Sequence, residues 1–234
     1  MSRRQLLLAI DIGTSGVKVG IFDVRGRLAA KAVASYATTT PHPGWVEQDP
    51  AAWWLASCKA VKEAASLIDS SEIQGLCVVG LSPALVCVDA QGEVVRHAPI
   101  WSDQRAADEI AELSQKLGPH IAFTYLPRLL WLARHEGEAY RRTRWAFEPF
   151  DYINFKLTGE AVCVPQAGAS LPWTAQDLVD LGLEPEKIPS PVCSLGKITG
   201  RLRADVAAAL GLPAGLPAVA GTIDAFAAWV GTAT

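Results

Sequence analysis

The stretch that decides the fold is residues 6–23, with the sequence LLLAIDIGTSGVKVGIFD. Its two apolar runs, 6–10 and 17–22, predict two β-strands joined by a tight turn. At the turn the chain carries one carboxylate, two hydroxyls, two glycines and a lysine, namely Asp11, Gly13, Thr14, Ser15, Gly16 and Lys18. Glycines let the backbone approach a ligand closely and adopt positive φ, and successive backbone N–H groups in such a turn bind anions. The turn is therefore predicted to bind phosphate, with Thr14, Ser15 and Lys18 adding donors.

Asp11 is the unusual member of this turn, because a carboxylate repels a phosphate unless a cation lies between them. Its position at the end of an apolar strand, facing a phosphate-shaped turn, suggests Mg²⁺ carried by a nucleotide. The alternative is an ordinary hairpin with a polar turn and no ligand.

The common nucleotide motifs are absent from the sequence. No Gly-x-x-x-x-Gly-Lys-Ser/Thr and no Gly-x-Gly-x-x-Gly occurs, so neither a Walker loop nor a dinucleotide fingerprint is supported. A strand–turn–strand phosphate site is instead typical of the ribonuclease-H-like ATPase fold shared by actin, hexokinase and many sugar kinases. Residues 6–23 resemble the first phosphate motif of that superfamily. The expected fold class is therefore α/β, with a mixed sheet and flanking helices.

Length and composition limit the classes of function. The chain has 234 residues, half of them hydrophobic, which suffices for a sizeable core. A net charge of −3 argues against nucleic acid as the main partner. The five cysteines are scattered and odd in number, as expected for reduced thiols of a cytoplasmic protein. No apolar stretch is long enough to predict a membrane span.

Local signals mark several further elements. Asp49 and Pro50 are a suitable N-cap and first residue of a helix. Helical spacing predicts that this helix buries one face, formed by Trp54, Cys58, Val61, Ala65 and Ile68. Apolar strands are expected at 73–81, 84–88 and 217–221, a helix is expected at 147–157, and Asp224 opens the final helix.

Five stretches together resemble one family, the FGGY carbohydrate kinases, which include glycerol kinase, xylulokinase, gluconokinase and ribulokinase. The matching stretches are 11–18, 43–50, 101–105, 151–160 and 220–224. They occur in the family's order and span nearly the whole chain.

The resemblance implies a two-lobed enzyme that uses ATP and Mg²⁺ to phosphorylate a small sugar or polyol. Residues 1–234 would form the N-terminal, sugar-binding lobe, and the C-terminal lobe that binds adenine would be absent from this chain. The resemblance implies no nucleic-acid or membrane partner and is compatible with a homodimer.

The resemblance also assigns roles to individual residues. Asp224 matches the catalytic aspartate, which accepts the proton of the sugar hydroxyl; the residue alone is equally suited to capping a helix. Asp11 would hold Mg²⁺ through water, and Gly13, Thr14, Ser15 and Lys18 would surround the phosphates. Trp101, Asp103, Arg105 and Asp224 would bind the sugar, although Trp101 could be a core residue and Asp103 a helix cap. Asp11 and Asp224 should lie within roughly 10 Å of each other and open onto one cleft, because both must reach the transferred phosphoryl group.

Two loops depart from the xylulokinase pattern. The segment 81–86 is shorter than the usual loop and lacks its histidine, and 165–170 lacks the usual aspartate and arginine. Both loops help to select the sugar, so ketose, polyol and sugar acid all remain open as substrates. Two rival functions also remain: a stand-alone sugar-binding or regulatory domain, and an actin-like or chaperone-like ATPase.

Overall fold

The structure of the protein is a computed structural model that describes residues 5–166 and 170–232. Part of the divergent loop 165–170, at 167–169, lies outside the described residues. The strands are β1 Leu6–Ile12, β2 Gly16–Asp23, β3 Leu28–Ser35, β4 Glu47–Gln48, β5 Ile73–Gly80, β6 Val86–Val88, β7 Ala98–Pro99, β8 Trp145–Phe147, β9 Ile198–Arg201 and β10 Pro217–Val219. The helices are α1 Pro50–Ala65, α2 Ala107–Leu117, α3 Leu126–His135, α4 Gly137–Arg142, α5 Pro149–Thr158, α6 Ala175–Asp180, α7 Ala204–Leu210 and α8 Asp224–Thr232, with 3₁₀ turns η1 Ser70–Glu72, η2 Pro119–Phe123 and η3 Pro185–Lys187.

The central feature is a six-stranded mixed sheet in the order β3-β2-β1-β5-β10-β9. The first three strands form an antiparallel meander, and β1, β5 and β10 run parallel at its centre. The parallel strands place the carboxyl ends of β1, β5 and β10 at one edge. The predicted mixed sheet with flanking helices is confirmed.

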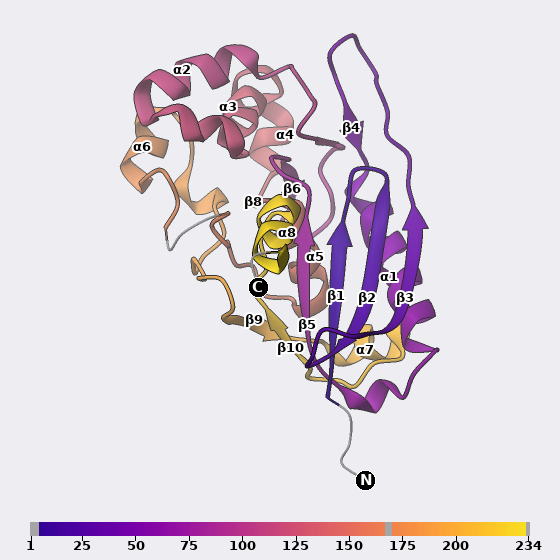
Figure 1. The fold of residues 1–234 in the computed structure, drawn as a ribbon. Coiled ribbons are helices and arrows are strands. Elements are labelled where there is room, and N and C mark those ends of the chain that lie inside the picture. Colours follow the sequence, from indigo (N-terminus) through magenta and orange to yellow (C-terminus); the bar gives the residue numbers. More distant parts are fainter. Residues whose placement is uncertain (1–4, 167–169, 233–234) are drawn as a thin grey trace.

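Helices cover the two faces of this sheet unequally. Helices α1, α5 and α7 pack behind it and share the main core with the buried residues of β1, β2 and β5, whereas α8 lies in front of β5 (Figure 1). A second hydrophobic cluster holds α2, η2, α3 and α6 together beside the sheet (Figure 1). No helix among residues 5–166 and 170–232 is long and apolar enough to cross a membrane.

Helix α1 begins as predicted, and its buried face includes the expected Val61 and Ala65 but is shifted toward Trp53. Asp49 caps it by accepting a hydrogen bond from the Ala51 N–H, and Pro50 is its first residue. The fully buried aromatic residue is Trp53, whereas Trp54 and Cys58 only reach the edge of the core. Four alanines complete the buried face (Ala56, Ala60, Ala64 and Ala65). Their small side chains leave little hydrophobic signal in the sequence, which explains the misplaced face.

Two smaller predictions were also inaccurate. The strand expected at 84–88 is shorter and leaves the main sheet, because β6 pairs with β8 instead. Residue Phe147, expected to begin a helix, ends β8, and α5 starts at Pro149.

The sheet edge leaves no room for a side chain at Gly221. A Cβ placed there would overlap the carbonyl oxygen of Val78 on β5, which is rigid backbone. We therefore expect Gly221→Ala to lower the free energy of unfolding by about 3 kcal/mol, the upper end for overpacking. Chemical denaturation measures this change.

Gly231→Ala is the matched control. A Cβ at Gly231 meets nothing within 4 Å among the described residues, and the position is helical. Its unfolding free energy should stay unchanged or rise by up to about 1 kcal/mol. Equal effects of the two substitutions would contradict the close packing at Gly221.

Candidate active site

The predicted phosphate turn connects β1 to β2 and is held by backbone contacts. The Gly13 N–H donates to the Gly16 carbonyl over 3.0 Å, and the Tyr36 hydroxyl donates to the Gly13 carbonyl. Gln48 donates to the Thr14 carbonyl over 2.7 Å and accepts from the Trp53 indole over 2.9 Å. The turn is therefore anchored to the fully buried Trp53, while the side chains of Thr14 and Ser15 remain exposed.

The glycines of this turn do not have the expected positive φ. The structure gives another reason for glycine: a Cβ at Gly16 would lie 2.6 Å from the Ala34 carbonyl oxygen on β3. Close packing of β2 on β3, and not a left-handed conformation, excludes side chains at this position.

Asp11 and Lys18 face each other across the β1–β2 ladder and form an ion pair of 2.9 Å. The second carboxylate oxygen of Asp11, Oδ1, is buried and has no hydrogen-bond partner in the described part of the chain. Lys18 is 66% exposed, so its ammonium group can also reach solvent. From the sequence, Asp11 was predicted to hold Mg²⁺ and Lys18 to contact the phosphates, but no contact between them was predicted; in the structure they form an ion pair.

Sheet pairing brings Asp11 and Asp224 to the same edge. Ile12 and Ile223 both pair with Gly80 on β5, so the segments that carry the two aspartates are two strand spacings apart, about 10 Å. Ile10 and Ile12 point into the core beneath α1, so Asp11 points to the opposite face, where α8 lies. Asp224 is half-buried, and its Oδ1 accepts from the Ala225 N–H over 2.6 Å. The expected distance between the two carboxylates stays a prediction that this topology supports.

Trp101 lies against the phosphate turn. Its indole N–H donates to the Thr14 hydroxyl over 3.2 Å, and its side chain is exposed, at 53%. An exposed indole beside the turn can cover the C–H face of a sugar. Trp101 is therefore not a core residue.

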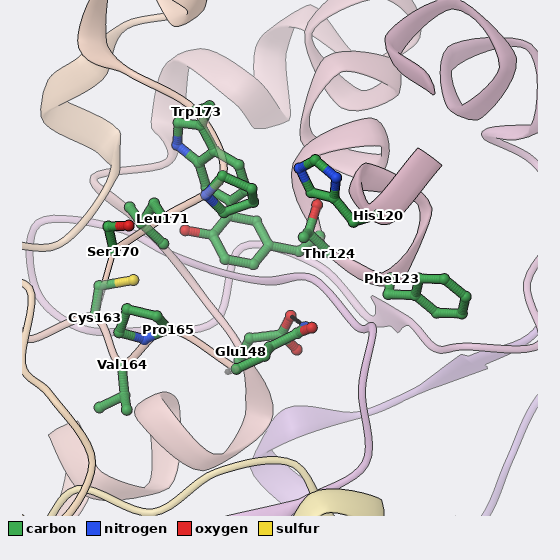
Figure 2. A pocket seen from close by; sticks show the side chains of 13 residues that line it. His120, Phe123, Thr124, Glu148, Cys163, Val164, Pro165, Ser170, Leu171 and Trp173 are labelled. Carbon is green, nitrogen blue, oxygen red and sulfur yellow. Dashed lines mark hydrogen bonds between the residues drawn. The ribbon is translucent and has the colours of Figure 1, made fainter. Parts of the chain in front are cut away.

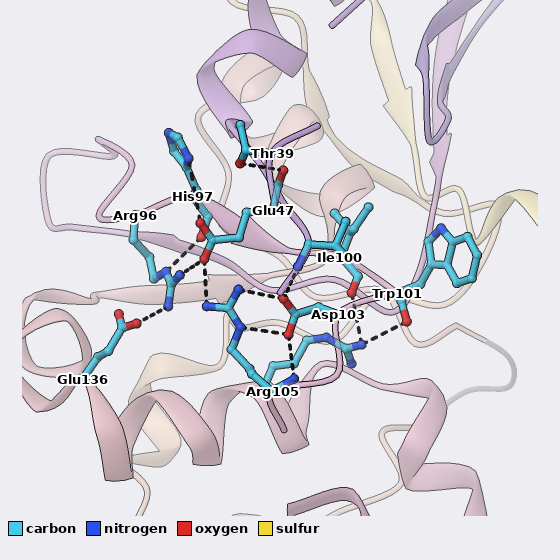
Figure 3. A network of polar contacts seen from close by, with 11 residues as sticks. Thr39, Glu47, Arg96, His97, Ile100, Trp101, Asp103, Arg105 and Glu136 are labelled. Atoms are coloured by element: carbon cyan, nitrogen blue, oxygen red, sulfur yellow. Dashed lines mark hydrogen bonds and ion pairs between the residues drawn. The ribbon is translucent and has the colours of Figure 1, made fainter. Parts of the chain in front are cut away.

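Asp103 and Arg105 are placed differently from the prediction. Their side chains are 0% and 1% exposed and form a two-point ion pair with each other. Arg105 also pairs with Glu47 over 2.7 Å and stacks on Trp45, with 3.9 Å from the guanidinium carbon to the ring centre. Figure 3 shows the Arg105 guanidinium between Asp103 and Glu47. Buried and paired in this way, the two side chains expose no atom to a sugar, so their direct contact with the sugar stays a prediction that this burial does not support.

The burial gives Asp103 and Arg105 a supporting role. Asp103 accepts from the Val46 N–H over 2.6 Å and thereby joins the 101–105 segment to the segment before β4. Arg128 donates to the carbonyls of Ile100 and Trp101 over 3.2 and 3.4 Å. This network fixes the backbone that carries Trp101 (Figure 3).

A cavity of about 250 Å³ lies between η2, the start of α5 and residues 163–166 and 170–173 (Figure 2). Aromatic and aliphatic side chains form most of its wall, with Glu148, Gln166, Thr124 and His120 among the polar residues. Figure 2 shows Glu148 between Pro165 and Phe123. Glu148 was not predicted as a site residue, although an acidic residue within the apolar run Trp145–Phe150 is a signal in the sequence.

The Glu148 carboxyl is buried and hydrogen-bonded. Gln166 donates to it over 2.8 Å, and the Ala84 N–H over 3.3 Å. Burial raises the pKa of Glu148 to about 7, against the lowering effect of these hydrogen bonds and of the Arg128 charge. Burial likewise raises the pKa of Asp151 well above its usual range.

The residues at the turn fit a magnesium ion that arrives with a nucleotide. Magnesium is usually held by one or two carboxylates, with phosphates and water as its other ligands. The unpartnered Oδ1 of Asp11 can serve as such a carboxylate, directly or through water. Among residues 5–166 and 170–232, no group of three or more His, Cys, Asp or Glu side chains could hold a metal by itself.

Comparison with known proteins identifies the family. The sequence model described as "FGGY family of carbohydrate kinases, N-terminal domain" matches residues 6–231. The chain belongs to the FGGY family of carbohydrate kinases. Its fold is accordingly the actin-like ATPase fold of this family.

Individual relatives of this FGGY domain are named as sugar kinases. The chain is 32% identical to xylulose kinase of Escherichia coli (strain K12), covering 97% of this chain and 50% of that protein. It is 30% identical to autoinducer-2 kinase of Klebsiella pneumoniae, covering 93% and 45%. The structure superposes on xylulose kinase from Rhodospirillum rubrum with a TM-score of 0.86 and 31% identity, covering 97% of this chain and 50% of the other.

The FGGY domain spans about half the length of the curated relatives it matches. These relatives are named as kinases, so they do not favour a stand-alone regulatory domain. The chain shares the fold of actin-like ATPases, but its membership of a carbohydrate kinase family argues against the function of an actin-like or chaperone-like ATPase.

The buried ion pairs of Arg105 should make the stability of the fold sensitive to substitution of this residue. Lysine cannot reproduce the two-point pairing and ring stacking of an arginine. Arg105→Lys should therefore lower the free energy of unfolding by roughly 2–4 kcal/mol, because one ammonium group cannot replace both bonds to buried Asp103 and the contact with Glu47, which keeps its ion pair with Arg96. Arg203→Lys is the control, since the Arg203–Asp205 pair is exposed and should contribute at most about 1 kcal/mol. Denaturant titration of both variants measures the difference, and equal losses would contradict the assignment.

Glu148 generates a prediction about pH. Its pKa is about 7 in the fold and near 4.5 in the unfolded chain, so the folded state favours the protonated form. Its contribution to stability is complete below about pH 4.5 and is lost as the pH rises to about 7. The free energy of unfolding of Glu148→Gln, taken relative to that of the wild type, should therefore increase by on the order of 2–3 kcal/mol from pH 4.5 to pH 8. Unfolding free energies of both proteins at these two pH values test this, and a constant difference would contradict it.

Proposed function

We propose that this chain is the N-terminal, sugar-binding lobe of a kinase that transfers the γ-phosphoryl group of ATP to a hydroxyl of a ketose, polyol or sugar acid. The observation that carries the proposal is the meeting of the β1–β2 turn, Asp11 and Asp224 at one edge of the sheet. Family membership over residues 6–231 supports it independently.

Asp224 is the catalytic base in this proposal. A sugar hydroxyl is a poor nucleophile, and a carboxylate that accepts its proton increases its reactivity and aligns it. The first turn of α8 and the neighbouring strand β5 hold Asp224 in place, and its half-buried side chain remains reachable. The proton would pass from the acceptor oxygen to the Asp224 carboxylate while that oxygen bonds to the γ-phosphorus of ATP and the bond from this phosphorus to the bridging oxygen breaks, releasing ADP.

The β1–β2 turn would bind the phosphates. Exposed Thr14 and Ser15 supply hydroxyls, and Lys18 supplies positive charge beside Asp11; Gly13 keeps the backbone open. Asp11 is the residue that would hold Mg²⁺ through water. When bound, ATP supplies the phosphoryl group and its magnesium offsets the charge that develops on it.

Trp101 would cover one face of the acceptor, and the buried Asp103–Arg105 pair would hold the backbone that carries Trp101 in position. A cytoplasmic location is part of the proposal and agrees with five free cysteines.

Substitution of Asp224 tests the proposal in the full-length protein. Asp224→Asn should lower kcat by roughly 10²–10⁴-fold, because asparagine cannot accept the proton. The Kd for the acceptor should change little, since the shape and polarity are kept. Steady-state kinetics and calorimetry measure the two quantities.

Asp205→Asn is the matched control, because Asp205 is exposed on α7. Its kcat should equal that of the wild type. A kcat for Asp224→Asn within a few-fold of wild type would rule out Asp224 as the base.

A further inference from the structure

The cavity in Figure 2 contains polar groups that the fold does not use. The Trp173 indole N–H is buried and has no hydrogen-bond partner among residues 5–166 and 170–232. The buried Tyr125 hydroxyl also has no hydrogen-bond partner in the described part of the chain, although the Cys163 thiol, a weak acceptor, interacts with it. Unpaired buried donors are costly, and a bound ligand with acceptor oxygens would satisfy them.

The cavity adjoins the segment that carries Asp224. The Thr222 hydroxyl, two residues before Asp224, donates to the Gln166 carbonyl over 2.6 Å. The Gln166 side chain donates in turn to Glu148 and to the Ser82 hydroxyl. One residue, Gln166, therefore separates the cavity's carboxyl group from the segment of the proposed catalytic base.

The size and lining of the cavity restrict its ligand. A volume of about 250 Å³ is below the range of about 300–1,000 Å³ typical of drug-sized ligands. Phe123, Trp173 and Leu171 offer apolar surface to C–H groups, while Glu148 and the Trp173 N–H offer one acceptor and one donor. This combination suits the end of a short polyhydroxylated chain.

Glu148 is not neutralised by a direct ion pair in the described part of the chain. Arg128 is the neighbouring cation, but its hydrogen bonds go to the Ile100 and Trp101 carbonyls, and it does not line the cavity. A second buried acid, Asp151, lies close enough to interact with Glu148. Among the described residues that line the cavity there is no lysine or arginine, and His120 is the remaining basic side chain, so an entering carboxylate would meet the Glu148 carboxyl without a permanent cation facing it.

Building on the proposed function, we infer that this cavity receives the non-reacting end of the acceptor and that Glu148 is a specificity-determining residue that selects a neutral, hydroxyl-bearing end over a carboxylate. A hydroxyl can donate to Glu148 and accept from the Trp173 N–H. At pH 8, above the pKa of about 7 of Glu148, this carboxyl is ionised, so the carboxylate of a sugar acid would bring like charges together in the cavity and bind more weakly. The inference thus favours ketoses and polyols over sugar acids.

The test compares acceptors in the full-length protein. Initial rates give kcat/KM for D-xylulose and xylitol, which are neutral, and for D-xylonate and D-gluconate, which are acids. The wild type should prefer the better neutral acceptor over the better acid by at least about tenfold. Glu148→Gln removes the charge and keeps the shape, so it should reduce this ratio by about tenfold or more.

Glu63→Gln is the matched control, because Glu63 is exposed on α1 and the chemical change is the same. It should leave the ratio unchanged. A wild type that prefers a sugar acid, or a Glu148→Gln ratio equal to that of the wild type, would overturn the inference and leave the proposed kinase function standing. Absence of phosphorylation of any acceptor by the wild type would overturn the proposed function, and the inference with it.

Trp173→Phe provides a second variant in case Glu148→Gln does not fold. It removes only the indole N–H and keeps an aromatic wall. It should raise KM for the preferred neutral acceptor about fivefold, the usual effect of one lost hydrogen bond. An unchanged KM would show that the acceptor does not reach this cavity.

Discussion

The arrangement of the site depends on one constraint, the pairing of both β1 and the segment after β10 with β5. Ile12 and Ile223 are 211 positions apart in the chain, yet both pair with Gly80. Because β1, β5 and β10 are parallel, their carboxyl ends meet at one edge, and the aspartates beside these ends come together there. The constraint requires close backbone contact, which explains why a glycine occupies position 221. Moving β1 by one residue along β5 would turn Asp11 to the opposite face of the sheet.

The polar residues around this edge divide into two groups with different physical roles. Thr14, Ser15, Lys18 and Trp101 are exposed and available to a ligand. Asp103, Arg105 and Glu47 are buried and already satisfied by one another. A buried ion pair contributes little net stability but strongly penalises any arrangement that separates it. The network therefore fixes the position of the Trp101 segment more than it stabilises the whole fold.

The cavity around Glu148 has the opposite character to the phosphate turn. The turn presents exposed hydroxyls and an ammonium group, whereas the cavity is mostly apolar with a buried acid. A charged phosphate suits the first environment, and the carbon chain of a sugar suits the second. Gln166 and Thr222 connect the cavity through hydrogen bonds to the segment that carries Asp224. The two parts of the proposed reaction thus have separate surroundings within one lobe.

The sequence by itself determined the strand–turn–strand unit, the start of α1 at Asp49 and Pro50, the mixed α/β class and the family. These features depend on local signals: apolar runs, turn residues and motifs in a fixed order. It could not show which polar residues are buried, so Asp103 and Arg105 were expected at the sugar and Glu148 was overlooked. Nor could it show that α1 turns Trp53, not Trp54, into the core, or that Lys18 pairs with Asp11. Burial and pairing depend on contacts between residues far apart in the chain, and only the tertiary structure specifies those contacts.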